Sequence, residues 1–164
     1  MDRILVSACL VGWPVRFDGG IRTSHDPRLA AWAAEGRLVP ICPETAAGLS
    51  TPRPAAEIEP GADAEAVHEG RARIVDAAGG DHTSAFLEGA RVAVATARVR
   101  GCRYALMTEG SPSCGVEFVA DGTFSGRRKA GEGVVTRALR AAGVEVFSPA
   151  DIDALAARIA AEAG

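Results

Sequence analysis

Three cysteines follow short apolar runs that have the character of buried strands. In a parallel α/β sheet the carboxyl ends of the strands meet at one edge, and the loops that leave them build the binding sites. A cysteine in a turn of serine, proline and glycine adds little to packing, so its sulfur is the feature that could do chemistry. The runs and the cysteines that follow them are 4–8 with Cys9, 37–41 with Cys42, and 104–107 with Cys114, which lies in EGSPSCGVEF.

The fourth cysteine differs in its position relative to its strand. Cys102 precedes the run 104–107 and comes directly after Gly101, a natural stop for the preceding helix. We therefore expect Cys102 at the opposite end of the sheet and outside any site shared by the other three.

Three thiols from separate loops can hold a metal, and the residue types leave several interpretations open. Closed structural zinc sites use four ligands and usually draw on close Cys-x-x-Cys pairs, which this sequence lacks. An iron–sulfur cubane can be held by three thiolates, which leaves one iron open to a soft atom such as sulfur. Three cysteines that only line a group of loops, with no metal, are the remaining alternative.

The elements that must position these thiols alternate between strands and helices. Apolar residues at helical spacing predict a helix over 83–100, and further helices are expected at 26–36 and 133–142. Residues 71–75 and 144–147 are expected strands, Ser148-Pro149 predicts the start of a terminal helix, and the Pro-rich stretch 49–60 predicts a loop. The alternation predicts an α/β fold: a mostly parallel sheet flanked by helices on both faces, as in Rossmann-like three-layer proteins.

Composition limits the classes of partner and the number of domains. A chain of 164 residues, 48% of them hydrophobic, can bury one core, so we expect a single domain over 1–164. A net charge of -3 gives no basic field for a phosphate backbone, which favours a small-molecule substrate over nucleic acid. The short apolar run at the N-terminus is too brief for a signal or membrane segment, so a cytoplasmic location with reduced thiols is expected.

Six short motifs resemble, in order, those of a small bacterial family long catalogued as a domain of unknown function, which includes the thiouracil desulfidases. The resemblance covers roughly residues 3 to 148, and the combination is more specific than any single motif. The motifs are VSACLVG (6–12), RFDGG (16–20), CPE (42–44), TPRPAAEI (51–58), SPSCG (111–115) and DGTFSG (121–126).

The resemblance implies removal of sulfur from a thiolated uracil, giving uracil and hydrosulfide, on a [4Fe-4S] cluster with one open iron. It implies that Cys9, Cys42 and Cys114 are the cluster ligands, the same trio that strand topology selects. It also implies that Glu44 and Ser111 are acid/base or positioning groups that assist attack by water. A cluster with an open iron is expected to be lost in air.

Other residues are weaker candidates, and each has a structural alternative. Arg16, Asp18 and Arg53 are predicted to bind substrate, although Asp18 also suits a turn and Arg53 could be held by loop packing. Glu44 could sit at a helix start only because the helix dipole favours a carboxylate there, and Ser111 could only cap its turn. The three histidines are expected at the surface.

Two features bear on the shape of the pocket and on the size of the substrate. Val15 and Phe17 stand where many members of the family carry a further cysteine and a tyrosine, which alters the pocket wall but not the ligand trio. Glycines at 126, 131 and 133, beside the basic run 127–129, could hold the phosphate of a nucleotide. The alternatives to a desulfidase are a non-catalytic metal- or redox-binding module and a cluster-free α/β protein.

Overall fold

Four parallel strands form the central sheet of the computed structural model, which describes residues 2–19 and 24–163. Their order across the sheet is β2-β1-β5-β8. Every neighbouring pair is parallel, so the four carboxyl ends lie at one edge of the sheet. The strands are β1 (Arg3–Ser7), β2 (Leu38–Ile41), β5 (Cys102–Leu106) and β8 (Glu145–Phe147).

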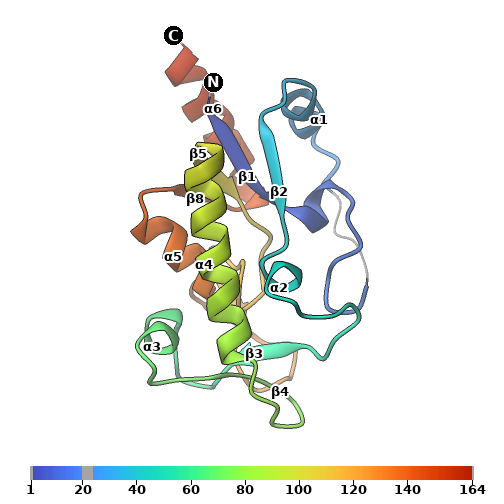
Figure 1. Cartoon of the computed structure of the whole chain (residues 1–164), viewed down its shortest axis with the longest axis vertical. Helices are drawn as coiled ribbons and strands as arrows, with labels where there is room; N and C mark the ends of the chain where they lie inside the picture. The colour runs from blue at the N-terminus through green and yellow to red at the C-terminus, as the bar shows by residue number, and fades with distance from the viewer. Residues whose placement is uncertain (1, 20–23, 164) are drawn as a thin grey trace.

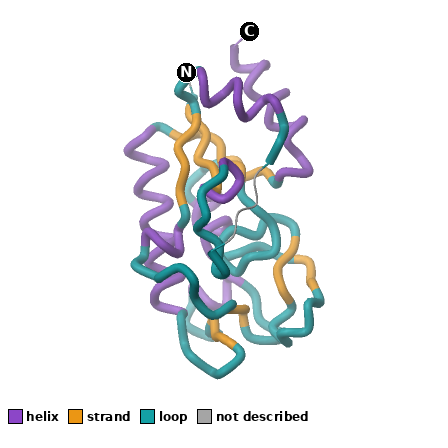
Figure 2. The backbone as a smooth tube through the Cα atoms, turned by 90° about the vertical axis from the view of Figure 1, so that its right-hand side faces the viewer, coloured by secondary structure: helices purple, strands orange, loops and turns teal. Residues whose placement is uncertain are grey.

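Helices cover both faces of this sheet (Figures 1 and 2). Successive residues of β1 point to opposite faces: Ile4 and Val6 belong to one buried cluster, and Leu5 belongs to the other. The first cluster is completed by α1 (Pro27–Ala34) and α6 (Ile152–Ala163), the second by α4 (Thr83–Arg100) and α5 (Val134–Ala141). The predicted α/β fold, with a parallel sheet flanked on both faces, is confirmed.

The helix ends show which local signals were decisive. Asp26 caps α1, because its side chain accepts a hydrogen bond from the Arg28 backbone N–H at 2.9 Å. Gly101 ends α4 in the left-handed conformation, as expected for a glycine stop. The terminal helix differs from the prediction: Pro149–Asp151 forms a 3-10 turn before α6, and the Ser148 hydroxyl caps no backbone N–H but lies 3.4 Å from Asp151 Oδ2.

Short elements lie beyond the carboxyl edge of the main sheet. Part of the predicted loop 49–60 forms a short strand. The strand predicted at 71–75 pairs with it and begins at Ile74, three residues later than predicted. A second antiparallel pair was not predicted, because three-residue strands carry too little periodicity to be recognised. These elements are β3 (Ala56–Ile58) with β4 (Ile74–Asp76), β6 (Phe118–Ala120) with β7 (Arg128–Ala130), the 3-10 turn η1 (Ala8–Val11), and the short helices α2 (Pro43–Ala46) and α3 (Ala64–His68).

A glycine in α4 sets how closely α2 approaches it. A Cβ atom on Gly89 would lie 2.7 Å from the carbonyl oxygen of Pro43, closer than van der Waals contact allows. Pro43 is the first residue of α2 and stands between Cys42 and Glu44. The close packing of the two helices therefore positions two predicted site residues.

Gly89→Ala is expected to lower stability although alanine is the better helix former. Alanine gains about 1 kcal/mol in helix propensity, whereas overpacking against fixed backbone costs about 1 to 3 kcal/mol. Thermal unfolding of the variant measures the balance, and we expect a lower midpoint than that of the wild type. The control Ala95→Gly, at an exposed position of the same helix, loses only helix propensity. An unchanged or raised midpoint for Gly89→Ala would mean that α2 is not held by this contact.

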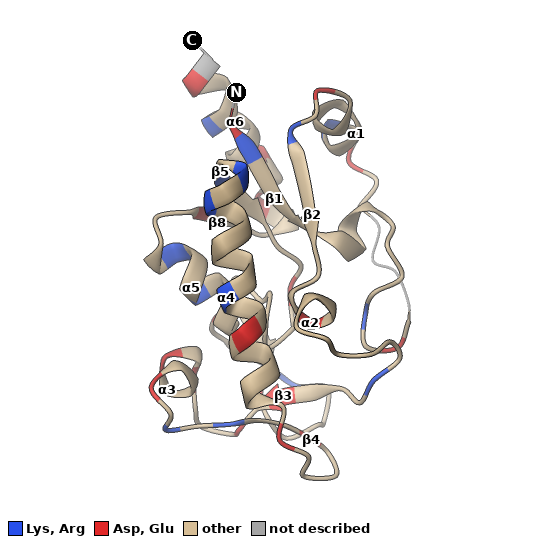
Figure 3. Cartoon of the chain, in the orientation of Figure 1, with Lys and Arg blue, Asp and Glu red and all other residues tan. Residues whose placement is uncertain are grey.

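Charged residues are spread over most elements (Figure 3). Within the described ranges, no helix has both the length and the apolar character that crossing a membrane requires.

Candidate functional site

The candidate site lies where the order of the strands reverses. β1 pairs with β2 on one side and with β5 on the other. The helix α1, which comes after β1, and the helix α5, which comes after β5, cover opposite faces of the sheet. The loops that leave β1 and β5 therefore diverge, and such a point is where open α/β sheets bind ligands. A cavity of about 240 Å³ is found here, at the carboxyl edge of the sheet.

Three cysteines line this cavity: Cys9, Cys42 and Cys114. Cys9 lies in the turn after β1, Cys42 directly follows β2, and Cys114 lies in the loop that follows β5. None of them is in a disulfide. Cys102 is buried at the amino end of β5 and is not among the described residues that line the cavity. The structure thus brings together the trio selected from the sequence and separates Cys102 from it.

The donor set around the cavity is the kind that can hold an iron–sulfur cluster. In a tetrahedral zinc site, bonds of about 2.3 Å bring the sulfur atoms to about 4 Å from one another. Among residues 2–19 and 24–163, no three Cys, His, Asp or Glu side chains lie close enough to hold one metal ion. In an iron–sulfur cubane each thiolate binds a different iron, and three thiolates leave one iron open. Three cysteines from separate loops around one cavity match this donor set.

The environment of Cys114 disfavours a free thiolate. Burial raises the pKa of its thiol well above the ordinary range, and the nearby Glu44 and Cys42 act in the same direction. A bound metal would reverse this balance, because coordination deprotonates a thiol outright. A free thiolate nucleophile at Cys114 is therefore disfavoured.

The loop that carries Cys114 is held by the first turn of α5. The Val134 N–H donates to the Pro112 carbonyl at 2.8 Å, and the Val135 N–H donates to the Ser113 carbonyl at 3.0 Å. The first N–H groups of a helix lack partners within it, so the loop caps α5 while α5 fixes the loop. The helix thus fixes the backbone of the turn that carries Cys114, and Cys114 lines the cavity.

Thr136 in α5 and Gly133, which precedes α5, also hold the loop that carries Cys114. The Thr136 hydroxyl donates to the Cys114 carbonyl at 3.0 Å. A Cβ atom on Gly133 would lie 2.3 Å from the carbonyl oxygen of Ser113, so only glycine permits the approach. Gly133 was considered in the sequence as part of a phosphate site, but the structure uses it for this close packing.

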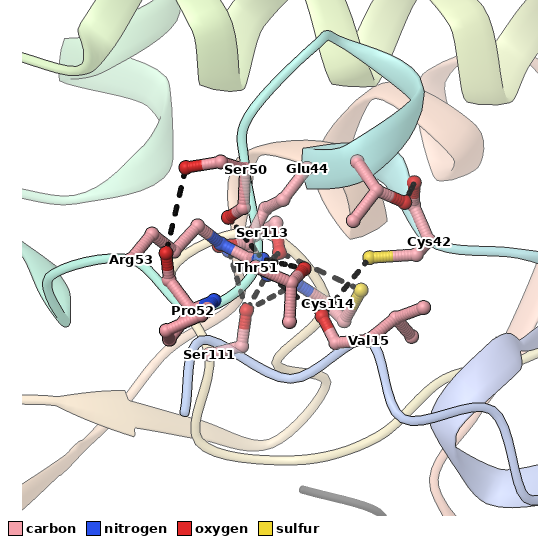
Figure 4. Close-up of polar contacts among 11 residues, drawn as sticks. Val15, Cys42, Glu44, Ser50, Thr51, Pro52, Arg53, Ser111, Ser113 and Cys114 are labelled. Carbon is pink, nitrogen blue, oxygen red and sulfur yellow. Dashed lines mark hydrogen bonds and ion pairs between the residues drawn. The ribbon is translucent and has the colours of Figure 1, made fainter. Parts of the chain in front are cut away.

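The carboxylate of Glu44 is held from two sides (Figure 4). Its Oε1 accepts from Arg53 Nε at 3.3 Å, and its Oε2 accepts from Ser113 Oγ at 3.1 Å. The side chains of Arg53 and Glu44 are only 6% and 16% exposed, so water screens this ion pair weakly. A carboxylate has about four lone-pair sites, so two remain for a water molecule or a substrate.

Arg53 joins three segments around the cavity. Its Nη1 donates to the Ser50 carbonyl at 3.1 Å and to Thr51 Oγ1 at 3.0 Å, and its Nη2 donates to the Val15 carbonyl at 3.0 Å. With the bond to Glu44, four of the five N–H groups of the guanidinium are occupied. Arg53 therefore fixes Glu44, and one N–H remains for the substrate contact predicted from the sequence.

Ser111 reaches Glu44 through Ser113. The two hydroxyl oxygens lie 2.6 Å apart, and Ser113 Oγ donates its one proton to the carboxylate of Glu44. Ser111 must then be the donor in the short bond between the serines. Its oxygen also accepts from the backbone N–H groups of Ser113 and Cys114, at 3.0 and 3.2 Å. Ser111 therefore caps its turn, as the structural alternative expected, and also begins a hydrogen-bonded chain that ends on Glu44.

The segment 15–19 supplies one wall of the cavity. Arg16 lines the cavity together with Val15 and Phe17, the two positions at which the sequence departs from the family pattern. Asp18 is exposed and is not among the described lining residues, so the structure brings Arg16 but not Asp18 to the cavity. Gly20 of the RFDGG motif lies outside the described residues.

Three arginines line the cavity beside the apolar residues, in addition to Arg53. Arg127 and Arg128 line it together with Arg16, and within the described ranges none of these three forms an ion pair with a carboxylate. The guanidinium of Arg128 lies 4.4 Å from the centre of the Phe118 ring, which also lines the cavity.

The histidines lie away from the cavity. His25 is exposed, His68 Nε2 lies 2.8 Å from the Val134 carbonyl oxygen, and His82 Nε2 lies 2.8 Å from Asp76 Oδ2. None of them is among the described residues that line the cavity.

Comparison with known proteins places the chain beside desulfurases. A family model described as 2-thiouracil desulfurase matches residues 4–151. The uncharacterised protein YbbK of Bacillus subtilis (strain 168) is 39% identical over 150 residues, which cover 92% of this chain and 97% of the relative. A solved structure described as the [4Fe-4S]-dependent thiouracil desulfidase TudS is 41% identical, with a TM-score of 0.88 over 98% of this chain and 99% of the other.

Proposed function

The chain belongs to the 2-thiouracil desulfurase family, and from this premise we propose that it removes sulfur from a thiolated uracil of the 2- or 4-thiouracil type. In this proposal Cys9, Cys42 and Cys114 hold a [4Fe-4S] cluster, and the whole chain acts as one desulfidase domain. The observation that carries the proposal is the meeting of three thiols with the Glu44 carboxylate around one cavity.

The reaction exchanges one atom of the ring substituent and transfers no electrons. The thiocarbonyl sulfur leaves as hydrosulfide, and the oxygen of a water molecule takes its place. The water loses both of its protons: one ends on the hydrosulfide and the other is released. When bound, the cluster supplies an open iron, a Lewis acid that attracts a soft sulfur atom. The residues of the chain must therefore hold the ring, place a water molecule and accept its proton.

Glu44 is the group positioned to accept that proton. Arg53 and Ser113 fix its two oxygens and leave a lone pair on each for a water molecule. The chain from Ser111 through Ser113 ends on the same carboxylate, so the two hydroxyls help to hold it beside the loop that carries Cys114. Glu44 therefore acts as general base, and Ser111 and Ser113 as positioning groups.

Apolar side chains limit the access of water to this carboxylate. Val15, Phe17, Ile41 and Phe118 line the cavity. A low-dielectric wall strengthens the interactions of Glu44 and excludes competing solvent. The 49–60 segment contributes Arg53 to the same wall.

Anaerobic reconstitution with iron and sulfide, followed by assay with 2- and 4-thiouracil, tests the proposal. We expect about four irons per chain, as for a cubane, together with release of hydrosulfide and uracil in equal amounts. A chain that binds the irons but releases no hydrosulfide would be a non-catalytic metal-binding module. A chain that binds no iron would contradict the proposed cofactor.

The three arginines in the cavity wall favour a phosphorylated substrate over the free base. Arg16, Arg127 and Arg128 line the cavity and supply N–H donors that a phosphate could accept. A phosphate on the ribose of a thiolated uracil nucleotide would neutralise them while the ring enters the apolar part of the cavity. We therefore propose that a nucleoside monophosphate is used more efficiently than the base.

Replacing Arg127 and Arg128 by alanine together should separate the two substrates. We expect the KM for a thiouridine monophosphate to rise roughly 10-fold or more, as for loss of a hydrogen bond to a charged group, with little change for the free base. The exposed Arg98 and Arg100, which form no ion pair within the described ranges, provide the matched double-alanine control. Equal changes for base and nucleotide would refute a phosphate contact with these arginines.

A further inference from the structure

The carboxylate of Glu109 joins the two ends of the loop that carries Cys114. Glu109 lies three residues after the end of β5, and its Oε1 accepts from the backbone N–H of Val116 at 2.6 Å and from that of Glu117 at 3.0 Å. Its Oε2 also accepts from the Glu117 N–H, at 3.0 Å. One side chain therefore closes the segment 110–115.

This set of bonds acts at a different place from the attachment to α5. The start of α5 holds residues 112–115, the middle and end of the loop. Glu109 acts between the segment that leaves β5 and the segment that enters β6, where the backbone bonds are long. The Gly110 N–H donates to the Phe118 carbonyl at 3.2 Å, and the Ala120 N–H donates to the Gly110 carbonyl at 3.3 Å. Since bonds to a charged acceptor are about twice as strong as neutral ones, the carboxylate is the stronger link between the two segments.

The geometry requires a carboxylate at this position. All three bonds come from backbone N–H groups, so both oxygens of Glu109 must accept. An amide has only one accepting oxygen, and its NH2 group would face the N–H of Glu117. Glutamine would therefore keep the size of the side chain and lose part of its hold on the loop.

We propose that Glu109 is a positioning residue that keeps the Cys114 thiol in place to bind the metal. Cys114 and Val116 are 5% and 4% exposed and belong to the same buried cluster. Loss of the bond from the Val116 N–H to Glu109 would let the loop open locally, which exposes Cys114 without unfolding the sheet. The inference rests on the proposed function, because it takes Cys114 as a cluster ligand.

Thiol labelling of the full chain before iron is added tests the hold on the loop. A maleimide reagent, followed by mass spectrometry, gives a separate labelling rate for each cysteine. We expect Glu109→Ala to raise the rate at Cys114 roughly 10-fold or more, as for loss of a hydrogen bond to a charged group. Cys102, which is 6% exposed and lies at the other end of β5, should keep its rate. Glu109→Gln should fall between Glu109→Ala and the wild type.

Retention of iron tests whether this hold positions the ligand. After anaerobic reconstitution, iron is removed by an excess of a chelator, and its loss is followed in the visible spectrum. We expect Glu109→Ala to lose iron faster than the wild type, because a loop that opens more often releases the Cys114 thiolate more often. Glu109→Gln should again be intermediate.

Glu57→Ala is the matched control. Glu57 Oε1 accepts from the backbone N–H groups of Gly122 and Phe124 at 2.9 and 3.1 Å, so Glu57 also holds a loop through its carboxylate. That loop, 121–127, contains no cysteine. Its release should change neither the labelling of Cys114 nor the retention of iron.

Each of the following results would overturn the proposal. An unchanged labelling rate at Cys114 would show that Glu109 does not hold the loop, and equal increases at Cys114 and Cys102 would show that it stabilises the whole fold. Faster labelling with wild-type retention of iron would show that the loop is held but that the ligand is not positioned by it. A wild-type chain that binds no iron would contradict both this proposal and the proposed function. Failure of the proposed function alone has a different signature: iron that is held by the wild type and lost faster from Glu109→Ala, without release of hydrosulfide.

Discussion

Cys114→Ala is expected to abolish both cluster binding and desulfuration. Two thiolates would remain where three are needed, and the lost one stands on the loop that α5 holds rigidly in place. We expect iron content after anaerobic reconstitution to fall close to zero, with release of hydrosulfide at background. Cys9→Ala and Cys42→Ala should behave in the same way, because their thiols line the same cavity.

Cys102→Ala is the control for this series. Cys102 is 6% exposed and lies at the opposite end of β5, so its replacement removes a buried thiol of the same kind without reaching the cavity. It should lose some stability and keep its iron and activity. Full iron and activity in Cys114→Ala, or loss of iron in Cys102→Ala, would mean that the ligands are wrongly assigned.

Glu44→Gln is expected to lower kcat by a factor of roughly 100 to 10,000, the range for loss of a general acid or base. Glutamine keeps the size of glutamate and can still accept from Ser113, but it cannot take the proton of the attacking water. The cluster ligands are untouched, so the iron content should stay at the wild-type level. Single-turnover release of hydrosulfide measures the effect on the chemical step.

Stability must be followed in the same variant, because Glu44→Gln leaves Arg53 without its anionic partner. The guanidinium is nearly buried, and an unpaired buried charge is costly. Circular dichroism and thermal unfolding show whether the fold survives. Glu88→Gln breaks an exposed ion pair with Arg91 and should change neither stability by much nor activity. Wild-type kcat in a folded, iron-loaded Glu44→Gln would eliminate Glu44 as the base.

The layers of the fold could be predicted from the sequence because the main helices and strands show a regular spacing of apolar residues, over a long stretch or between clear stop signals. The helix at 83–100 shows five turns of apolar spacing and ends at a glycine, and the structure has it as α4 with the same bounds. The pair β6 and β7 was missed, because strands of three residues carry no usable period. Packing against the carboxyl edge, not local preference, determines those elements.

The candidate site was predictable only where it follows from the topology of the sheet. Cys9 lies two residues after β1 and Cys42 directly follows β2, so a parallel sheet brings them to the same edge. The bond from Ser113 to Glu44 spans 69 residues and depends on how α5 holds the loop. No local pattern in the sequence encodes such a contact.

Arg53 illustrates the same limit. Its place between two prolines suggested either a substrate contact or loop packing, and the sequence could not choose between them. The structure commits four of its N–H groups to Glu44, Ser50, Thr51 and Val15. The local sequence shows that an arginine is present, but its hydrogen-bond partners are determined only when the segments around the cavity come together.

In the proposed reaction, oxygen from water replaces the sulfur of a thiolated uracil. The most direct test is the mass of the uracil formed by the anaerobically reconstituted protein in water enriched in heavy oxygen. We expect each uracil to carry one oxygen from the solvent and an equal amount of hydrosulfide to be released. Uracil without the heavy isotope, or no conversion by an iron-loaded chain, would contradict it.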